Sequence, residues 1–147
     1  MISFGNSNRI KSKHEPIVKV LVVEDEPIAM GIATLILKEK GCDVDAVSTG
    51  EAAIKYIDNT YHLILLDLGL PGMDGFDVAK IIRGTKGIDA PIIALTSSSS
   101  EENIELTRQL GLNGYIFKPF THSKCHTLLN KFIFSRFDPT YFYLIDN

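Results

Sequence analysis

Five short apolar runs alternate with five amphipathic stretches along this chain, and no other feature restricts its fold as much. The apolar runs, each short enough for a buried strand, are 18–23, 44–47, 63–66, 92–95 and 115–117. The amphipathic stretches are 27–40, 51–58, 75–83, 101–110 and 121–134. A repeated β-α unit predicts a parallel sheet, because right-handed crossovers place helices on both of its faces. The expected fold class is therefore α/β, doubly wound, with five parallel strands.

Residues at the boundaries of the expected helices agree with these assignments. Pro27 suits a first helical turn, while Gly41 and Gly111 are typical residues just after a helix end. Good N-cap types precede three of the helices: Thr49, Asp74 and Ser100.

The first expected helix has an apolar stripe. Ile28, Ile32, Leu35 and Ile36 recur at spacings of three and four, which places them along one side of a helix. We expect this stripe to face the core.

The ends of the chain differ from the β-α pattern. Residues 1–16 are polar and end in a proline, so they are expected to form a linker or a disordered lead-in to a single domain at 17–134. Residues 135–147 contain Pro139 and an aromatic cluster at 141–143, and their structure and role stay open.

Composition excludes several classes of protein. A formal net charge of -3 and a pI near 5.8 give no basic face for nucleic acid, so no nucleic-acid contact is expected. No apolar run approaches the ~20 residues that cross a bilayer, and the N-terminus lacks the apolar segment of a secretory signal. A cytoplasmic protein without a membrane contact is expected.

Polar residues follow the expected strands at their carboxyl ends. Glu24 and Asp25 follow the first run, Asp67 ends the third, Thr96 follows the fourth and Lys118 the fifth. Because ligands of doubly wound sheets bind at this edge, we expect these side chains to form one site.

The residue types at this edge indicate phosphoryl chemistry. Carboxylates held close together repel one another, and a hard dication with oxygen ligands, Mg²⁺ or Mn²⁺, compensates their charge. Together with the Lys118 ammonium and the Thr96 hydroxyl, such an ion could hold a phosphoryl group during attack by Asp67.

Four motifs in order, VLVVEDEP, LILLDLGLPGMDG, PIIALTS and YIFKPF, resemble the receiver domains of two-component response regulators. The resemblance covers about residues 17–134. It implies the flavodoxin-like strand order 2-1-3-4-5 and a protein that catalyses its own aspartyl phosphorylation and dephosphorylation rather than a metabolic enzyme.

The same resemblance assigns roles within the site. Asp67 would be the phosphoacceptor and Lys118 would pair with the phosphoryl oxygens. Asp25 would bind Mg²⁺ directly, Glu24 mainly through water, and Gly69 through its backbone carbonyl.

The resemblance also implies a switch. Thr96 would move its hydroxyl toward the phosphate and Tyr115 would turn inward, which reshapes the face of the fourth helix, fifth strand and fifth helix. Pro71 matches the loop after the phosphoacceptor, and Pro119 matches a cis-proline of the family.

The implied partners are a histidine kinase or a histidine phosphotransfer protein, and an unidentified downstream protein. The chain could be a stand-alone receiver or the receiver of a hybrid histidine kinase, and its tail could pair two chains as a homodimer. A receiver-fold docking module that needs no phosphorylation is the alternative. A flavin carrier is disfavoured, because the first β-α turn is acidic where a flavin phosphate would need donors.

Overall fold

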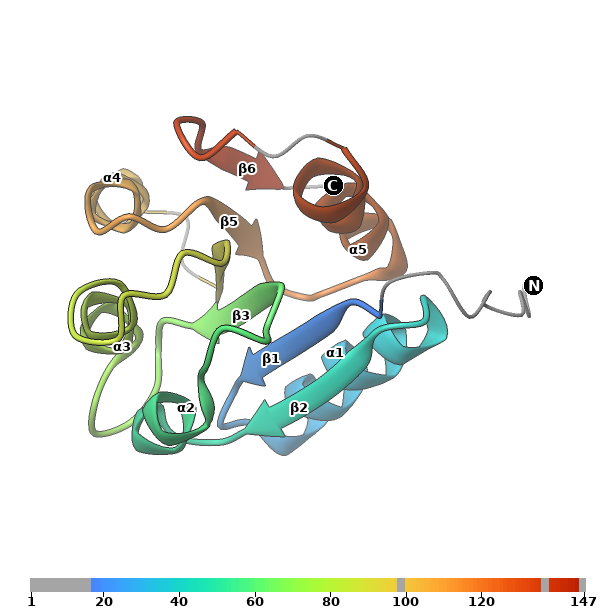
Figure 1. Cartoon of the computed structure of the whole chain (residues 1–147), viewed down its shortest axis with the longest axis horizontal. Helices are drawn as coiled ribbons and strands as arrows, with labels where there is room; N and C mark the ends of the chain where they lie inside the picture. The colour runs from blue at the N-terminus through green and yellow to red at the C-terminus, as the bar shows by residue number, and fades with distance from the viewer. Residues whose placement is uncertain (1–16, 98–99, 136–137, 146–147) are drawn as a thin grey trace.

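The computed structural model describes residues 17–97, 100–135 and 138–145, so the expected lead-in at 1–16 lies outside the described residues. Its centre is one parallel sheet in the order β2-β1-β3-β4-β5-β6 (Figure 1). The strands, in chain order, are β1 (Lys19–Val23), β2 (Asp43–Val47), β3 (Leu63–Asp67), β4 (Ile92–Thr96), β5 (Gly114–Phe117) and β6 (Tyr143–Ile145). The expected doubly wound order of the first five strands is confirmed.

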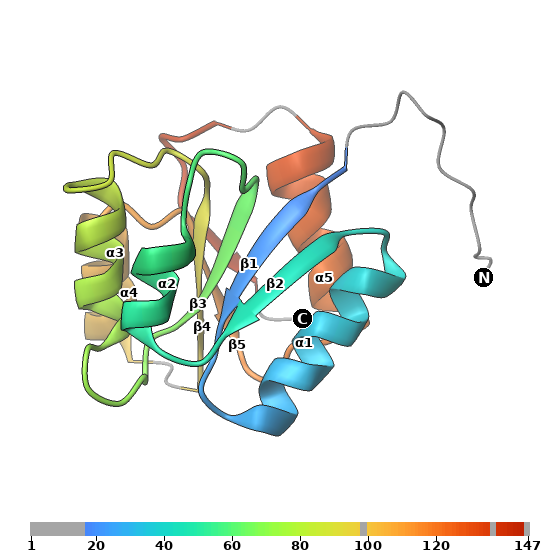
Figure 2. The same cartoon turned by 60° about the horizontal axis from the view of Figure 1, so that its bottom comes forward.

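Helices cover both faces of the sheet. They are α1 (Pro27–Glu39), α2 (Gly50–Tyr56), α3 (Gly75–Arg83), α4 (Glu101–Gln109) and α5 (His122–Leu129), followed by a π-helical turn, η1 (Asn130–Phe134). α1 and α5 lie on one face, and α2, α3 and α4 lie on the other (Figure 2). None of the helices in the described parts of the chain is long and apolar enough to cross a membrane.

The expected helix caps are confirmed. Thr49, Asp74 and Ser100 each accept a hydrogen bond from a backbone N–H in the first turn of the helix that follows. Gly41 and Gly111 have φ of 89° and 85°, a left-handed conformation that glycine adopts without a steric penalty.

Each strand contributes side chains to two hydrophobic cores, because successive residues point to opposite faces. Val20 and Val22 pack with α1 and α5, whereas Leu21 and Val23 pack with α2 and α3. All residues of β3 and β4 are buried, as expected for central strands that are covered on both faces.

The expected core stripe of α1 is largely wrong. Ile36 is 4% exposed, but Ile28, Ile32 and Leu35 are 72%, 44% and 60% exposed. The helix instead buries Ile36 with Ala33 and Leu37 against the sheet. Because α1 is apolar around most of its circumference, the spacing of its apolar residues could not identify the buried side.

The tail adds a sixth strand to the five that were expected. β6 runs parallel to β5 with Tyr115 opposite Leu144, and the Tyr143 N–H donates to the Asn113 carbonyl at 3.1 Å. Ile145 is 1% exposed and joins the core beneath α5. The Tyr143 ring packs edge-on against the Phe132 ring, with 5.3 Å between the ring centroids. Residues 143–145 of the tail are therefore part of the folded unit.

Candidate functional site

The polar residues predicted from the strand ends lie at one edge of the sheet. Asp67 of β3 pairs in register with Leu95 of β4, and Thr96 pairs with Phe117 of β5. Lys118 follows β5 directly, and its backbone N–H donates to the Thr96 carbonyl at 2.8 Å. Parallel pairing thus gathers segments that are far apart in the sequence.

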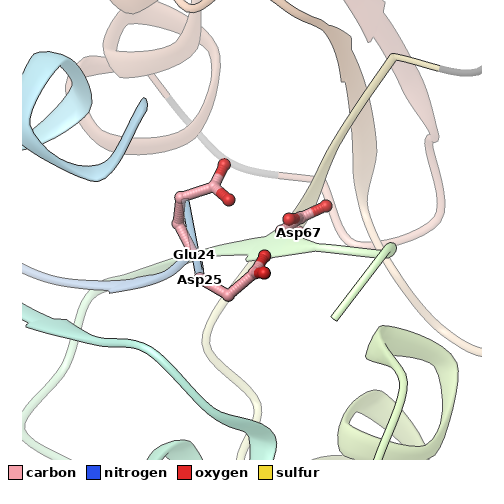
Figure 3. A group of neighbouring side chains, drawn as sticks. All are labelled: Glu24, Asp25 and Asp67. Carbon is pink, nitrogen blue, oxygen red and sulfur yellow. The ribbon is translucent and has the colours of Figure 1, made fainter. Parts of the chain in front are cut away.

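Three carboxylates form the centre of this edge. Glu24 and Asp25 follow β1 and Asp67 ends β3 (Figure 3). One oxygen from each lies within 4.8 Å of the others. Glu24 is fully buried and Asp67 is 6% exposed, while Asp25 is exposed. Two of the three negative charges are therefore shielded from water.

Lys118 supplies the positive charge beside these acids. Its Nζ lies 2.6 Å from Oε1 of Glu24 and 3.5 Å from Oδ2 of Asp67. Burial acts to lower the pKa of Lys118, but Glu24 and Asp67 outweigh it and raise the pKa above the ordinary lysine value. Lys118 is therefore firmly cationic at neutral pH.

The pKa of the Glu24 carboxyl is also raised, but here burial is the largest cause. Its burial raises its pKa, and the ion pair with Lys118 only partly opposes this, while Asp67 adds to the rise. Its second oxygen accepts a hydrogen bond from the Glu26 N–H at 3.2 Å. Glu26 itself caps α1 by accepting from the backbone N–H groups of Ile28 and Ala29, so it has a structural role.

The loop after β3 fixes the orientation of Asp67. The Gly69 N–H donates to Oδ1 of Asp67 at 2.9 Å, which leaves Oδ2 on the side of Lys118. Gly75 begins α3 so close to this loop that a Cβ there would lie 2.6 Å from the Asp67 carbonyl oxygen. Pro71 lies in the turn between these two glycines.

Thr96 and Tyr115, the residues expected to switch, lie on neighbouring strands. Ala94 of β4, rather than Thr96, is opposite Tyr115 in register. Thr96 is 7% exposed, and Tyr115 is fully buried with its ring edge-on to Phe117 at 5.3 Å. The peptide bond between Lys118 and Pro119 is cis, as the resemblance implied.

The acidic cluster fits a hard divalent cation. All its side-chain donors are carboxylate oxygens, which Mg²⁺ and Mn²⁺ prefer, and the burial of Glu24 and Asp67 leaves their charge in need of compensation. In the parts of the chain that the structure describes, this is the one group of three or more acidic, histidine or cysteine side chains so arranged.

A groove of about 400 Å³ adjoins the site. It lies between α1 and the segment after β5, and its lining residues are Glu26, Ile28, Ala29, Ile32, Leu95, Lys118, Pro119 and Phe120. The exposed apolar side chains of α1 thus lead directly to Lys118.

The sequence alone did not identify one residue that lies beside the site. Lys124 in α5 is 6% exposed, and its Nζ donates to the carbonyl oxygens of Phe117 and Pro119 at 2.6 and 3.1 Å. The available signal was a lysine directly before Cys125 and four residues before Leu128, on the inner side of the helix.

Comparison with known proteins identifies the family. Residues 20–130 match the response regulator receiver domain. The chain is 32% identical over 118 residues to transcription factor SKN7 of Saccharomyces cerevisiae, covering 80% of this chain and 19% of SKN7. It is 31% identical over 127 residues to the osmosensing histidine protein kinase SLN1 of the same yeast, covering 82% of this chain and 10% of SLN1. The chain therefore spans only a small part of these relatives.

Solved structures agree with this match. The receiver domain of sensor histidine kinase PA1611 from Pseudomonas aeruginosa, which carries a magnesium ion in its active-site cleft, is 32% identical with a TM-score of 0.73. The similarity covers 82% of this chain and all of that one. Chemotaxis protein CheY4 of Vibrio cholerae has a TM-score of 0.75 at 26% identity, covering 80% of this chain and all of CheY4. Because the family match covers most of the chain and agrees with the order of its sheet, this chain belongs to the response regulator receiver family.

Proposed function

We propose that this chain takes a phosphoryl group from a phosphohistidine onto Asp67 in a Mg²⁺-dependent reaction. The observation that carries the proposal is the meeting of Glu24, Asp25 and Asp67 within 4.8 Å, with the Lys118 ammonium 3.5 Å from Asp67. An oriented carboxylate, oxygen ligands for a dication and a fixed cation are the groups that in-line phosphoryl transfer needs.

In the proposed reaction, a carboxylate oxygen of Asp67 attacks phosphorus while the bond from phosphorus to the donor imidazole breaks. The imidazole nitrogen keeps the electron pair and takes a proton from solvent, leaving an aspartyl phosphate on this chain. The Gly69 N–H holds Oδ1, so Oδ2, which faces Lys118, is the oxygen better placed to attack. Water later cleaves the aspartyl phosphate and restores Asp67.

Glu24, Asp25, Asp67 and the Gly69 carbonyl would hold the metal ion, Glu24 mainly through water. A bound Mg²⁺ supplies electrostatic stabilisation of the phosphoryl oxygens. Lys118 would then exchange part of its contact with Glu24 and Asp67 for the incoming phosphoryl oxygens, because its ammonium carries three donors and already contacts the attacking carboxylate.

Phosphorylation would change the surface near β5 through Thr96 and Tyr115. The new charge attracts the Thr96 hydroxyl. The ring of the fully buried Tyr115 then moves into the space that the hydroxyl has left. β6 already pairs with the outer edge of β5, so a downstream partner would contact α4 and α5 or displace β6. The signalling unit would therefore include β6 as well as the β-α units of the receiver.

The donor would dock beside α1. A phosphohistidine must reach Asp67 past Lys118, and the groove at Lys118 continues into the exposed Ile28 and Ile32. These apolar side chains fit a helical partner such as a phosphotransfer protein or the histidine-bearing domain of a kinase. We also propose a cytoplasmic location for this chain.

Intact-mass spectrometry after incubation with acetyl phosphate tests the proposal. The wild-type chain is expected to gain one phosphoryl mass only when Mg²⁺ is present. Asp67→Asn should gain none, whereas the control Asp74→Asn, which changes the N-cap of α3, should behave as wild type. A folded wild-type chain that never gains mass would support the docking module instead.

A further inference from the structure

Lys124 is a buried cation outside the group of residues assigned to the reaction. It lies in the first turn of α5, where its backbone N–H donates to the capping hydroxyl of Thr121 at 3.2 Å. Its side chain is among the few charged groups that the described residues bury, with 6% of its surface exposed. A lysine is rarely buried to this extent unless its ammonium has partners.

The partners of this ammonium are two backbone carbonyls. Nζ of Lys124 donates to the oxygen of Phe117 at 2.6 Å and to the oxygen of Pro119 at 3.1 Å. These carbonyls belong to the residues on either side of Lys118. One cation thus holds the chain immediately before and after the lysine that contacts Asp67.

The same segment also makes a backbone hydrogen bond to the neighbouring strand. The Lys118 N–H donates to the Thr96 carbonyl at 2.8 Å, which ties the segment to β4. Charge-assisted hydrogen bonds from Lys124 are stronger than neutral ones, so they restrict rotation of the peptide groups that flank Lys118. The direction in which the Lys118 side chain leaves the backbone depends on those two peptide groups.

We propose that Lys124 is a positioning residue for phosphoryl transfer, which fixes the Lys118 ammonium against Asp67 by clamping the carbonyls of Phe117 and Pro119. The inference rests on the proposed function of Asp67. It adds a residue that touches neither the phosphoryl group nor the metal and acts through Lys118 alone.

The size of the effect follows from the geometry of the reaction. A misplacement of about 1 Å by a change remote from the chemistry can lower a rate by up to about 10²-fold. Lys124→Met keeps most of the length of the side chain but removes its donors. We expect this variant to lower the maximal rate of phosphorylation about tenfold, while the acetyl phosphate concentration for half-maximal rate changes little.

A double-mutant cycle separates positioning from a merely structural role. Rates are measured by intact mass for wild type, Lys124→Met, Lys118→Ala and the double variant, at saturating Mg²⁺. If Lys124 acts through Lys118, Lys124→Met slows the wild type but has no further effect in Lys118→Ala. Lys124→Arg, which keeps cationic donors, should recover most of the rate.

A control variant and a separate readout complete the design. Lys131→Met removes an exposed lysine of η1 that contacts only the Tyr143 ring among the described interactions, and it should leave the rate unchanged. The rise in thermal midpoint on adding Mg²⁺ should be the same in Lys124→Met as in wild type, because the acidic cluster is intact. If Lys124→Met does not fold, Lys124→Gln takes its place in the cycle, because its shorter and uncharged side chain cannot make the same charge-assisted hydrogen bonds.

The outcomes distinguish this inference from the proposed function. The positioning role would be overturned if Lys124→Met slowed phosphorylation equally in the wild type and in Lys118→Ala, or if a folded Lys124→Met left the rate unchanged. Asp67 would remain the phosphoacceptor in both cases. A wild-type chain that takes no phosphate would overturn the proposed function itself, and the role of Lys124 with it.

Discussion

The ammonium of Lys118 lies 2.6 Å from a carboxylate oxygen of Glu24, a side chain with no exposed surface. Without a metal ion, this ion pair is the main compensation for the buried charge of Glu24. Lys118 therefore neutralises part of the acidic cluster before any phosphoryl group binds. Its contacts affect how the stability of the folded chain depends on pH and on metal binding.

The raised pKa of Glu24 predicts an unusual pH dependence of stability. A carboxyl whose pKa is raised on folding contributes stability below its ordinary value of 4.5, and this contribution is lost as pH rises through the folded pKa. Carboxyls whose pKa is lowered, such as Glu105, act in the opposite direction. Subtracting the free energy of unfolding of Glu24→Gln from that of the metal-free wild type should therefore give a difference that falls with rising pH.

Urea unfolding at a series of pH values from mildly acidic to neutral measures this difference. Glu105→Gln, on the exposed side of α4, is the control and should give a difference that rises with pH or stays flat. A difference for Glu24→Gln that rises with pH would contradict the raised pKa.

Metal binding should stabilise the folded chain through the acidic cluster. At a Mg²⁺ concentration of 100 times Kd, binding to the folded state alone adds about 2.7 kcal/mol to the free energy of unfolding. Asp25→Asn should remove most of this gain, whereas Asp77→Asn, in the first turn of α3, should keep it. Thermal unfolding with and without Mg²⁺ provides the measurement, and an equal gain in both variants would argue against a metal site at Asp25.

The two sides of α1 should differ sharply in their contribution to stability. Ile36 is 4% exposed, so Ile36→Ala should cost about 2–5 kcal/mol through lost burial and a residual cavity. Ile28 is 72% exposed, and Ile28→Ala should change the free energy of unfolding by less than about 0.5 kcal/mol. Urea unfolding of both variants checks the assignment, and similar costs would mean that the helix is rotated.

The tail should contribute measurably to folding through one residue of β6. Ile145 is 1% exposed in the core beneath α5, and Ile145→Ala should cost about 2–5 kcal/mol. Its neighbour Leu144 is 52% exposed, and Leu144→Ala should change stability by less than about 0.5 kcal/mol. If both substitutions proved neutral, β6 would not be docked on β5 in solution.

Some features of the fold and the site could be predicted from the sequence alone. The strand ends were predictable because short apolar runs that alternate with capped helices form a parallel sheet, which leaves Asp67 and Lys118 at the same edge. The caps at Thr49 and Asp74 were predictable because they depend on local hydrogen bonds.

Other features depend on tertiary contacts that no local pattern specifies. Ile28 and Ile36 are chemically alike, and only the packing of α1 against the sheet makes one exposed and the other buried. β6 is short and depends on the free edge of β5, so the sequence around Tyr143 carries little signal for a strand. Lys124 has backbone acceptors, whose positions follow from the fold rather than from their residue types.

Trapping the aspartyl phosphate with borohydride shows directly whether Asp67 is the phosphoacceptor. Borohydride reduces an aspartyl phosphate to homoserine, so the modified residue can be located by peptide mass spectrometry after incubation with acetyl phosphate and Mg²⁺. We expect homoserine at position 67, dependent on Mg²⁺ and absent when Asp67 is replaced by Asn. Homoserine at Asp25 or Asp74 instead, or none at any position in a folded chain, would contradict this assignment.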